Sequence, residues 1–412
     1  MTVKSVKTGN STSLAVGNTT AAIPDAPTIG AVAAGTIADR QVTVAFTNAP
    51  KGAAGTTFTA TSTPSSITGS SATSPIAVSG LAAETSYTFT VKASNANGDS
   101  PASSASSSIT TSAPGSVRAI FAGGYNASEI SVNTMDYITM ETTGNATSFG
   151  TLTVARFQPA GCGSSTRGLF GSGGNPSTGG NYSNVIDYVT IMSAGNATDF
   201  GDLTVSAYGM AACSSDIRGV WAAGYDNTRQ NTIGYVTIAS TGNATDFGDL
   251  TVGRSGPAGC GSSTRGIFAG GNNGSTINVI DYITIASTGN ATDFGDLTSG
   301  GNNCGAASNS TRAIIVLGDS GSYTNNIDYV TIATTGNATD FGSLSVNRAQ
   351  CPAVASSLRV CFAGGNAEAG GMSNVIDYVT IASTGNATDF GDLTTSRGGA
   401  NPSGVSNGHG GL

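Results

Sequence analysis

Short runs in which apolar and polar residues alternate follow one another along the chain, separated by Gly, Asn and Ser. In the first quarter they include Gln41–Phe46, Thr56–Thr61, Ile76–Val78 and Ser86–Asn95. A period of two places successive side chains on opposite faces of a strand, and closely spaced strands of this kind are typical of an antiparallel sandwich. We therefore expect a β-sandwich in this part of the chain.

From Val117 onward the pattern changes to one phrase that occurs six times, most clearly from Asn374 to Thr394. In every copy a Tyr is followed twelve residues later by a Phe, and an Arg opens a short apolar run. These arginines are Arg118, Arg167, Arg218, Arg265, Arg312 and Arg359, so successive repeats are 49, 51, 47, 47 and 47 residues long. A period of this size indicates a repeat architecture.

Each repeat contains four runs of strand length. In the fourth repeat these are 258–263, 265–271, 278–287 and 292–298. Four short strands per repeat is the content of a β-propeller blade, so we expect six blades starting near residues 118, 167, 218, 265, 312 and 359. The first repeat lacks its first strand, and Arg397–Asn407 aligns with Arg254–Thr264. Residues 397–407 are therefore expected to complete the first blade and close the ring, which removes two open sheet edges.

Composition supports an all-β chain with at least two domains. Gly accounts for 59 of 412 residues and charged residues for 10%, and few segments favour a helix. We expect a leader at 1–23, a sandwich at 24–114 and the propeller at 115–412. The leader is either a flexible segment or a strand that attaches the protein to a larger assembly. The N-terminus has no apolar run long enough for a signal peptide, and no segment reaches membrane-spanning length.

The charged and nucleophilic residues argue against catalysis, cofactors, a resident metal and nucleic-acid binding. The formal charge is −8, no Lys follows Lys92, and the only His is His409, whereas phosphate binding needs clustered cations. We expect the six cysteines to be small buried residues without disulfides or metal; they are Cys162, Cys213, Cys260, Cys304, Cys351 and Cys361. Repeated Asp pairs are read either as solvated turn carboxylates or as calcium ligands; they are Asp199/Asp202, Asp246/Asp249, Asp293/Asp296 and Asp389/Asp392.

Comparison of the six copies with one another locates a candidate binding face. The connections between the second and third strands, and those that lead to the next repeat, vary in length and content. They supply the candidate ligand-binding residues, which are Tyr125, Tyr182, Tyr225, Arg229, Tyr323, Arg156, Arg254, Arg348 and Arg397. Arg and Tyr are enriched in recognition surfaces, and Arg can hold a carboxylate or sulfate through two hydrogen bonds. Alternatively, the last four arginines only bond the carbonyl groups of loops.

Two stretches resemble known modules. Gly80–Ser100 resembles the second half of a fibronectin type III domain, because Leu81 and Tyr87 match its tyrosine corner. The usual Trp of the second strand is absent, and Val44 or Phe46 is expected in its place. The repeats resemble kelch repeats in their strand order and in glycine pairs such as Gly270-Gly271, although Phe replaces the usual Trp.

The combination of leader, fibronectin-like module and near-identical repeats resembles structural proteins of marine tailed bacteriophages that infect cyanobacteria. The resemblance implies a non-enzymatic, surface-exposed virion protein of the tail fibre or baseplate, assembled in the host cytoplasm in multiple copies. Residues 1–23 and the sandwich would contact other virion proteins, and the propeller would contact a host glycan or receptor. The alternatives are a capsid decoration protein without a ligand and a bacterial cell-surface adhesin, which would need an export route.

Overall fold

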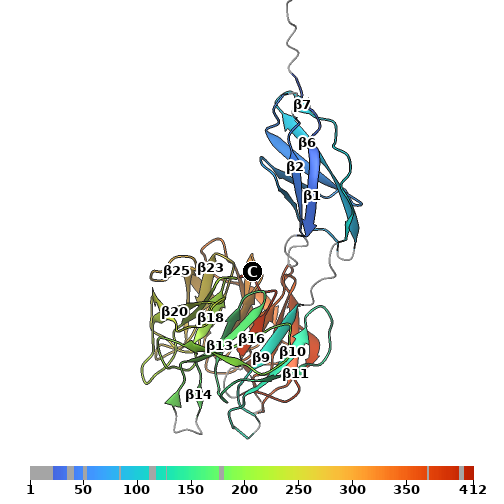
Figure 1. The fold of residues 1–412 in the computed structure, drawn as a ribbon. Helices are drawn as coiled ribbons and strands as arrows, with labels where there is room; N and C mark the ends of the chain where they lie inside the picture. Colours follow the sequence, from blue (N-terminus) through green and yellow to red (C-terminus); the bar gives the residue numbers. More distant parts are fainter. Residues whose placement is uncertain are drawn as a thin grey trace, which may run out of the picture. The chain divides into compact units, whose positions relative to one another are not determined.

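The computed structural model describes residues 22–34, 41–49, 53–82, 85–110, 117–126, 128–175, 181–368, 371–398 and 403–412. Their regular secondary structure consists of β-strands alone (Figure 1). The chain divides into two compact units, Met1–Gly115 and Ser116–Leu412. Within the described ranges, no helix is long and apolar enough to cross a membrane. All but the last two residues of the expected leader, 1–23, lie outside the described residues.

The first unit consists of two antiparallel sheets around one core. The first sheet has the order β1-β2-β5, and the second has the order β4-β3-β6-β7 with β8 paired to β6. Their strands are β1 (Thr28–Ala34), β2 (Val42–Thr47), β3 (Thr57–Thr63), β4 (Thr68–Ser71), β5 (Ile76–Val78), β6 (Ser86–Asn95), β7 (Gly98–Asp99) and β8 (Ile109–Thr110).

Alternate residues of these strands face the shared core, as the period-two pattern predicted. Val44 and Phe46 from β2 pack with Phe58 from β3 and Phe89 from β6, so both residues expected in place of the Trp are buried. The hydroxyl of buried Tyr87 accepts a hydrogen bond of 2.9 Å from the Ala82 N–H. This bond ties the start of β6 to the segment before it.

The second unit contains six four-stranded antiparallel sheets, consistent with a propeller-like repeat. Sheet one consists of β36 (Ser403–Ser406), β9 (Arg118–Ala122), β10 (Thr134–Thr139) and β11 (Thr147–Thr151). Sheet two consists of β12 (Ala160–Gly163), β13 (Arg167–Gly171), β16 (Val185–Thr190) and β17 (Thr198–Asp202). Sheet three consists of β18 (Ala211–Ser214), β19 (Arg218–Ala222), β20 (Thr232–Thr237) and β21 (Thr245–Asp249). Sheet four consists of β22 (Ala258–Gly261), β23 (Arg265–Ala269), β24 (Ile277–Thr284) and β25 (Thr292–Gly301). Sheet five consists of β26 (Gly305–Ser308), β27 (Arg312–Val316), β28 (Asn326–Thr331) and β29 (Thr339–Ser343). Sheet six consists of β31 (Ala353–Ala355), β32 (Arg359–Ala363), β34 (Val375–Thr380) and β35 (Thr388–Asp392). Two further two-stranded antiparallel sheets pair β14 (Gly174–Asn175) with β15 (Asn181–Tyr182), and β30 (Arg348–Ala349) with β33 (Asn366–Ala367).

The core of the second unit lies between neighbouring sheets. Six clusters of buried apolar side chains each join residues of two sheets; one contains Phe294 with Ile315, and another contains Phe390 with Phe121. The second strand of each sheet is buried on both faces, which explains why runs such as Arg265–Ala269 are continuously apolar after the Arg. All six cysteines are buried and unpaired, as the sequence predicted.

A glycine in every outer strand permits close contact with the next sheet. In β21, Gly248 has φ +146°, and a Cβ atom there would lie 2.5 Å from the carbonyl oxygen of Gly289. Only glycine adopts this backbone conformation readily and leaves that space free. This is why the Asp-Phe-Gly sequence recurs, and the Phe before the glycine turns inward at a bulge in the strand pairing.

The C-terminal strand β36 pairs with β9, as expected for residues 397–407. Its register differs from the alignment. Val405 pairs with Ile120, whereas in the fourth sheet Cys260 pairs with the corresponding Ile267. The tail strand is thus two residues later than the direct alignment of Arg397 with Arg254 implies.

Candidate functional site

The antiparallel order divides the connections of the second unit between two ends. The connections from first to second and from third to fourth strand share one end, and the other connections share the opposite end. Figure 1 shows β14 and the C-terminus at opposite ends of this unit. We call the end that carries Tyr125, Phe157, Tyr182, Tyr208 and Tyr225 the variable face, because its loops differ most between repeats.

Four predicted ligand-binding residues of this end are buried. The side chains of Arg156, Arg254, Arg348 and Arg397 are at most 1% exposed, and each Nη2 lies 2.6–2.9 Å from a carboxylate oxygen of a buried Asp. The partners are Asp187, Asp281, Asp377 and Asp136 respectively. Burial lowers the pKa of Arg156, and the charge of Asp187 opposes that change.

These arginines also bond main-chain carbonyl groups, which is the alternative that the sequence left open. Arg156 donates to the carbonyl oxygens of Ser172, Val185 and Phe170 at 3.2, 2.7 and 3.0 Å. A ligand would have to displace these partners to reach the guanidinium group. Ligand binding by the four arginines therefore stays a prediction, and none of them lines the pocket described below.

The Asp partners were missed by the sequence reading, although the repeats carry a signal. Ala207 of the second repeat replaces the Arg and Gly234 of the third repeat replaces the Asp, so both members of this pair are lost together. Gly301 of the fourth repeat replaces the Arg, while Asp328 of the fifth repeat remains and accepts hydrogen bonds from Thr298. Burial raises the pKa of Asp328, which has no arginine opposite it.

A continuous row of aromatic rings lies on the variable face. Tyr125 contacts Phe157 with ring centroids 5.0 Å apart, and Phe157 contacts Tyr208 at 5.3 Å. Tyr208 in turn lies 5.4 Å from Tyr182 and 5.6 Å from Tyr225. All five side chains are partly exposed. We call them the aromatic row; three were predicted as site residues, and Phe157 and Tyr208 were not.

The aromatic row occupies one half of the variable face. Phe157 and Tyr208 follow the fourth strands of the first two sheets, where the other four repeats have Ser255, Asn302, Ala349 and Gly398. Each such residue pairs through the main chain with the next loop, as Tyr208 does with Tyr225. The same scaffold position is thus aromatic on one side of the face and small or polar on the other. Tyr323 pairs with Asp319 in its own loop and has no recorded ring contact with another described aromatic side chain.

A pocket of about 440 Å³ lies beside Tyr208 and Tyr225. Its remaining walls are polar or glycine: Gln158, Arg229, Ser255, Gly256, Asn272, Asn302 and Asn303. Ligand sites for small molecules usually measure roughly 300–1,000 Å³. Exposed Arg229 is held at the rim, because its Nε and Nη2 both donate to Asn272 Oδ1 at 3.1 and 2.8 Å.

Two acceptors in this pocket are buried without a hydrogen-bond partner, namely Gln158 Oε1 and Asn302 Oδ1. The Nε2 of Gln158 donates to Asn303 Oδ1 at 3.4 Å, which leaves the amide oxygen for another group. Gln158 and Asn303 have φ of +48° and +52°, whereas the corresponding positions in two other repeats are Gly209 and Gly256 at +65° and +67°. Residues with side chains thus occupy positions whose positive φ favours glycine.

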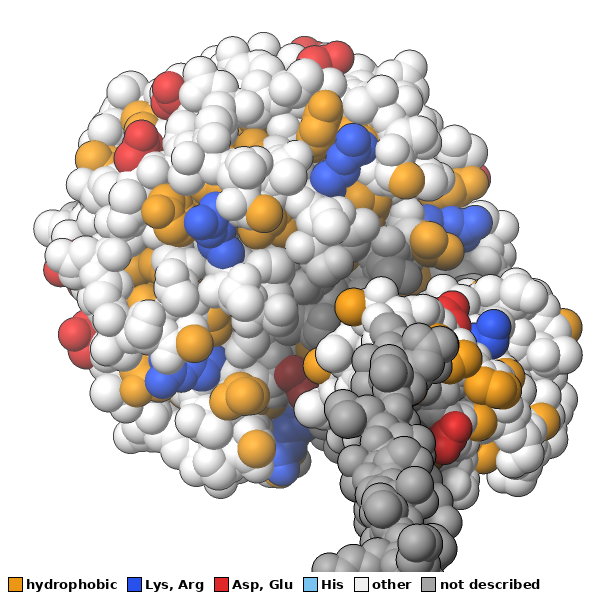
Figure 2. Space-filling view, turned by 90° about the horizontal axis from the view of Figure 1, so that it is seen from above, with side chains coloured by type: hydrophobic (Ala, Val, Ile, Leu, Met, Phe, Trp, Pro, Cys, Tyr) orange, Lys and Arg blue, Asp and Glu red, His pale blue; other side chains and the backbone are white. Residues whose placement is uncertain are grey.

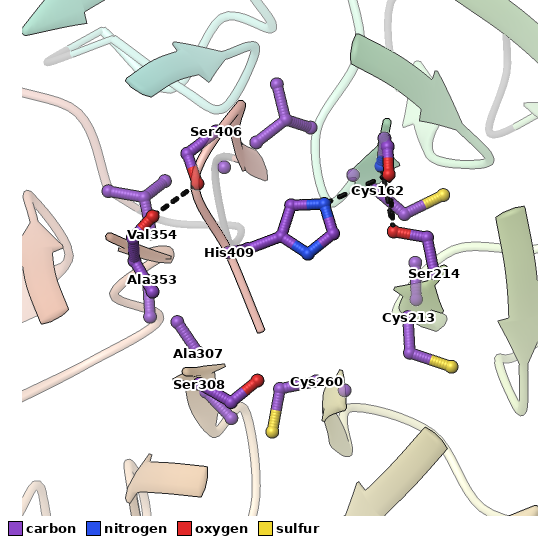
Figure 3. A pocket seen from close by; sticks show the side chains of 18 of the residues that line it. Cys162, Cys213, Ser214, Cys260, Ala307, Ser308, Ala353, Val354, Ser406 and His409 are labelled. Carbon is purple, nitrogen blue, oxygen red and sulfur yellow. Dashed lines mark hydrogen bonds between the residues drawn. The ribbon is translucent and has the colours of Figure 1, made fainter. Parts of the chain in front are cut away.

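A second, smaller cavity lies on the axis between the first strands of the six sheets (Figure 3). It measures about 50 Å³, enough for only a few water molecules. The imidazole of His409 lies between these first strands, where Nε2 is 3.0 Å from the Gly163 carbonyl oxygen and Nδ1 accepts a hydrogen bond from the Gly411 N–H. Burial lowers the pKa of His409. In Figure 3 the sulfur atoms of Cys213 and Cys260 point away from the cavity centre, so the thiols do not form a site there.

The end of the unit opposite the variable face presents separated charges. Figure 2, which views that end, shows basic side chains spread over the surface rather than gathered into one patch. Each repeat Arg lies over the ring of its own Tyr; Arg118, for example, is 4.2 Å from the Tyr137 centroid. Among the described residues, no cluster of three His, Cys, Asp or Glu side chains could hold a metal ion.

No protein-family model matches the chain, and no curated protein matches it.

Proposed function

We propose that this chain is a non-enzymatic attachment protein of a bacteriophage particle, and that its second unit binds a glycan or receptor on the host surface. The observation that carries the proposal is the aromatic row, confined to one half of one face of an otherwise near-identical repeat. Folding requires the same residues in every repeat. Binding instead requires residues that differ from the repeat sequence at one place, on loops held by a rigid scaffold. Partly exposed Tyr side chains are also the usual anchors of recognition surfaces.

The six sheets are the blades of a kelch-like propeller that β36 closes. Gly144 and Ala146 of the first repeat donate to Phe390 and Asp392 of the last, at 2.8 and 2.7 Å. Arg359 Nη1 lies 3.2 Å from the Met140 carbonyl, repeating across this junction the bond that Arg265 makes to Ile332. Such a ring holds the loops of the variable face in fixed positions.

The chemistry available in the pocket supports binding without turnover. The described residues of its lining offer amides, hydroxyls, one guanidinium and two phenol rings, and none of them carries a carboxylate, thiol or imidazole. Burial raises the pKa of Tyr208, and the neighbouring Tyr182 and Tyr225 add to this effect, so its phenol stays protonated. Hydrogen bonding and ring stacking remain, and general acid–base catalysis would need a group with a pKa near the working pH.

The virion role follows from the resemblance of the whole chain to structural proteins of marine tailed phages. On this proposal residues 1–23 and the first unit contact other virion proteins. Many copies on one particle would bind a surface together, so that shallow, individually weak sites give a firm attachment.

Attachment is tested with the full chain and envelope fragments of marine cyanobacteria immobilised on a biosensor. We expect saturable binding that is lost in the double variant Tyr182→Ala/Tyr208→Ala. The control is Leu358→Ala, which removes a side chain that is 62% exposed at the opposite end of the unit. Equal loss in both variants, or binding unaffected by the double variant, would refute attachment through the aromatic row.

A further inference from the structure

We propose that the pocket beside Tyr208 and Tyr225 is a subsite for one uncharged sugar unit of a longer glycan. This inference rests on the proposed function, because it names the ligand of the same face. It goes further in assigning donors, acceptors and the stacking surface to individual residues.

The unpartnered polar atoms of the pocket define what the ligand must supply. Gln158 Oε1 and Asn302 Oδ1 are both hydrogen-bond acceptors, and both are buried without a partner. A buried acceptor without a donor is destabilising, because it has lost its hydrogen bonds to water and gained none in return. A ligand that offers hydroxyl groups satisfies both atoms, and a sugar ring presents such groups on adjacent carbons.

The repeat itself shows that these amides are not needed for folding. Gly209 and Gly256 occupy the position of Gln158 in the next two repeats, with φ values in the same left-handed region. A Cβ atom at Gly256 would lie 2.4 Å from Asn302 Oδ1, and one at Gly209 would lie 3.1 Å from Gln158 Oε1. The glycines therefore leave space for the amides of their neighbours. Gln350 of the fifth repeat has a similar φ of +63° and an unpartnered Oε1 outside the pocket, so what distinguishes the pocket is the combination of Gln158 with Asn302 and the two tyrosines.

Tyr208 and Tyr225 supply the apolar wall against which a sugar ring packs. The C–H groups of a pyranose carry partial positive charge, and the face of an aromatic ring is negative. The aromatic row continues from Tyr208 through Phe157 to Tyr125, at centroid distances of 5.3 and 5.0 Å. This surface extends beyond the pocket and accommodates the neighbouring units of the chain.

The charges at the pocket favour an uncharged unit over an acidic one. Among the described lining residues Arg229 alone carries a charge, and two of its nitrogen atoms donate hydrogen bonds to Asn272. The two free acceptors repel the oxygen atoms of a carboxylate or sulfate. Hydroxyl donors fit the lining, and anionic oxygen atoms do not.

The experiment measures binding of individual sugars to the full chain by saturation-transfer NMR, followed by titration calorimetry of those that bind. The probes are glucose, galactose, mannose, N-acetylglucosamine, rhamnose and fucose, with glucuronic acid and sialic acid as acidic comparisons. The variants are Gln158→Gly, Tyr208→Ala and, as a control at the opposite end of the unit, Leu358→Ala. Gln158→Gly introduces the residue found at this position in two other repeats, so it is expected to fold.

We expect at least one neutral sugar to bind, with affinity reduced at least tenfold by Gln158→Gly and by Tyr208→Ala and unchanged by Leu358→Ala. Equal binding to the wild type and Gln158→Gly would overturn the subsite while leaving envelope attachment intact. If no neutral sugar binds but protease treatment of the envelopes abolishes attachment, the ligand is a protein and this inference is wrong. Failure to bind both sugars and envelopes would overturn the proposed function as well.

Discussion

The fifth repeat gives a natural control for the buried ion pairs of the second unit. In the sixth repeat, Asp377 lies 2.9 Å from Arg348, and both side chains are fully buried. In the fifth, Asp328 is also buried, but Gly301 occupies the position equivalent to the arginine. The same substitution, Asp to Asn, therefore removes a counter-charge in one repeat and an uncompensated charge in the other.

The expected magnitudes differ clearly. Asp377→Asn leaves the Arg348 guanidinium buried without a counter-charge, and breaking such a pair costs about 3–5 kcal/mol. Asp328→Asn removes a carboxylate whose pKa burial has raised, so the loss of ionic hydrogen bonds to Thr298 is offset by removal of a buried charge. We expect the free energy of unfolding to change by about 1 kcal/mol or less in this variant.

The assay is guanidinium-induced unfolding followed by tryptophan fluorescence. Trp221 is the only tryptophan of the chain and is fully buried in β19, so its emission reports on the second unit. The double variant Arg348→Met/Asp377→Asn serves as a control, because removing both charges should recover part of the lost stability. Similar losses for Asp377→Asn and Asp328→Asn would refute the reasoning.

Three further predictions concern packing and titration. The wild type should lose stability as the pH falls below about 6.5, because His409 binds a proton in the unfolded chain more readily than in the folded protein, where burial lowers its pKa. His409→Asn should reduce that loss, which is measured by comparing the free energy of unfolding at pH 7.5 and 5.5. Burial raises the pKa of Cys260 and of Cys361 to about 12, so a disulfide reagent at pH 8 should label the thiols only slowly until denaturant is added. Gly248→Ala should cost about 2 kcal/mol or more, and more than Gly289→Ala, which has a similar φ but open space around the added Cβ; thermal unfolding separates the two.

The strands of the second unit were predictable because the same pattern of residues recurs in six repeats. In the fourth repeat, the runs expected at 258–263, 265–271, 278–287 and 292–298 correspond to β22, β23, β24 and β25. The repeated Tyr and Phe also meet as expected of neighbouring strands; Tyr282 and Phe294 make an edge-to-face contact at 6.0 Å. Local patterning was enough here because strand order follows chain order within five of the six sheets of the second unit, and only the first of these sheets takes a strand, β36, from the far end of the sequence.

The site was less predictable for two physical reasons. The inner strands are buried on both faces, so period two does not separate buried from exposed positions, and Asp187 and its counterparts could not be recognised as core residues. The aromatic row depends on contacts between different repeats, as Phe157 with Tyr208 shows. Comparison of equivalent positions in the six repeats identified the variable face. The contacts of Phe157 and Tyr208 with the predicted tyrosines could be recognised only in the three-dimensional structure.

The location of a bound sugar tests the central claim most directly. The measurement is a crystal structure of the full chain soaked with the tightest-binding oligosaccharide from the sugar titrations. The account predicts one sugar ring against Tyr208 with hydroxyl groups bonded to Gln158 Oε1 and Asn302 Oδ1, and further units along Phe157 toward Tyr125. A sugar bound at the opposite end of the unit, or on the variable face away from the aromatic row, would contradict it.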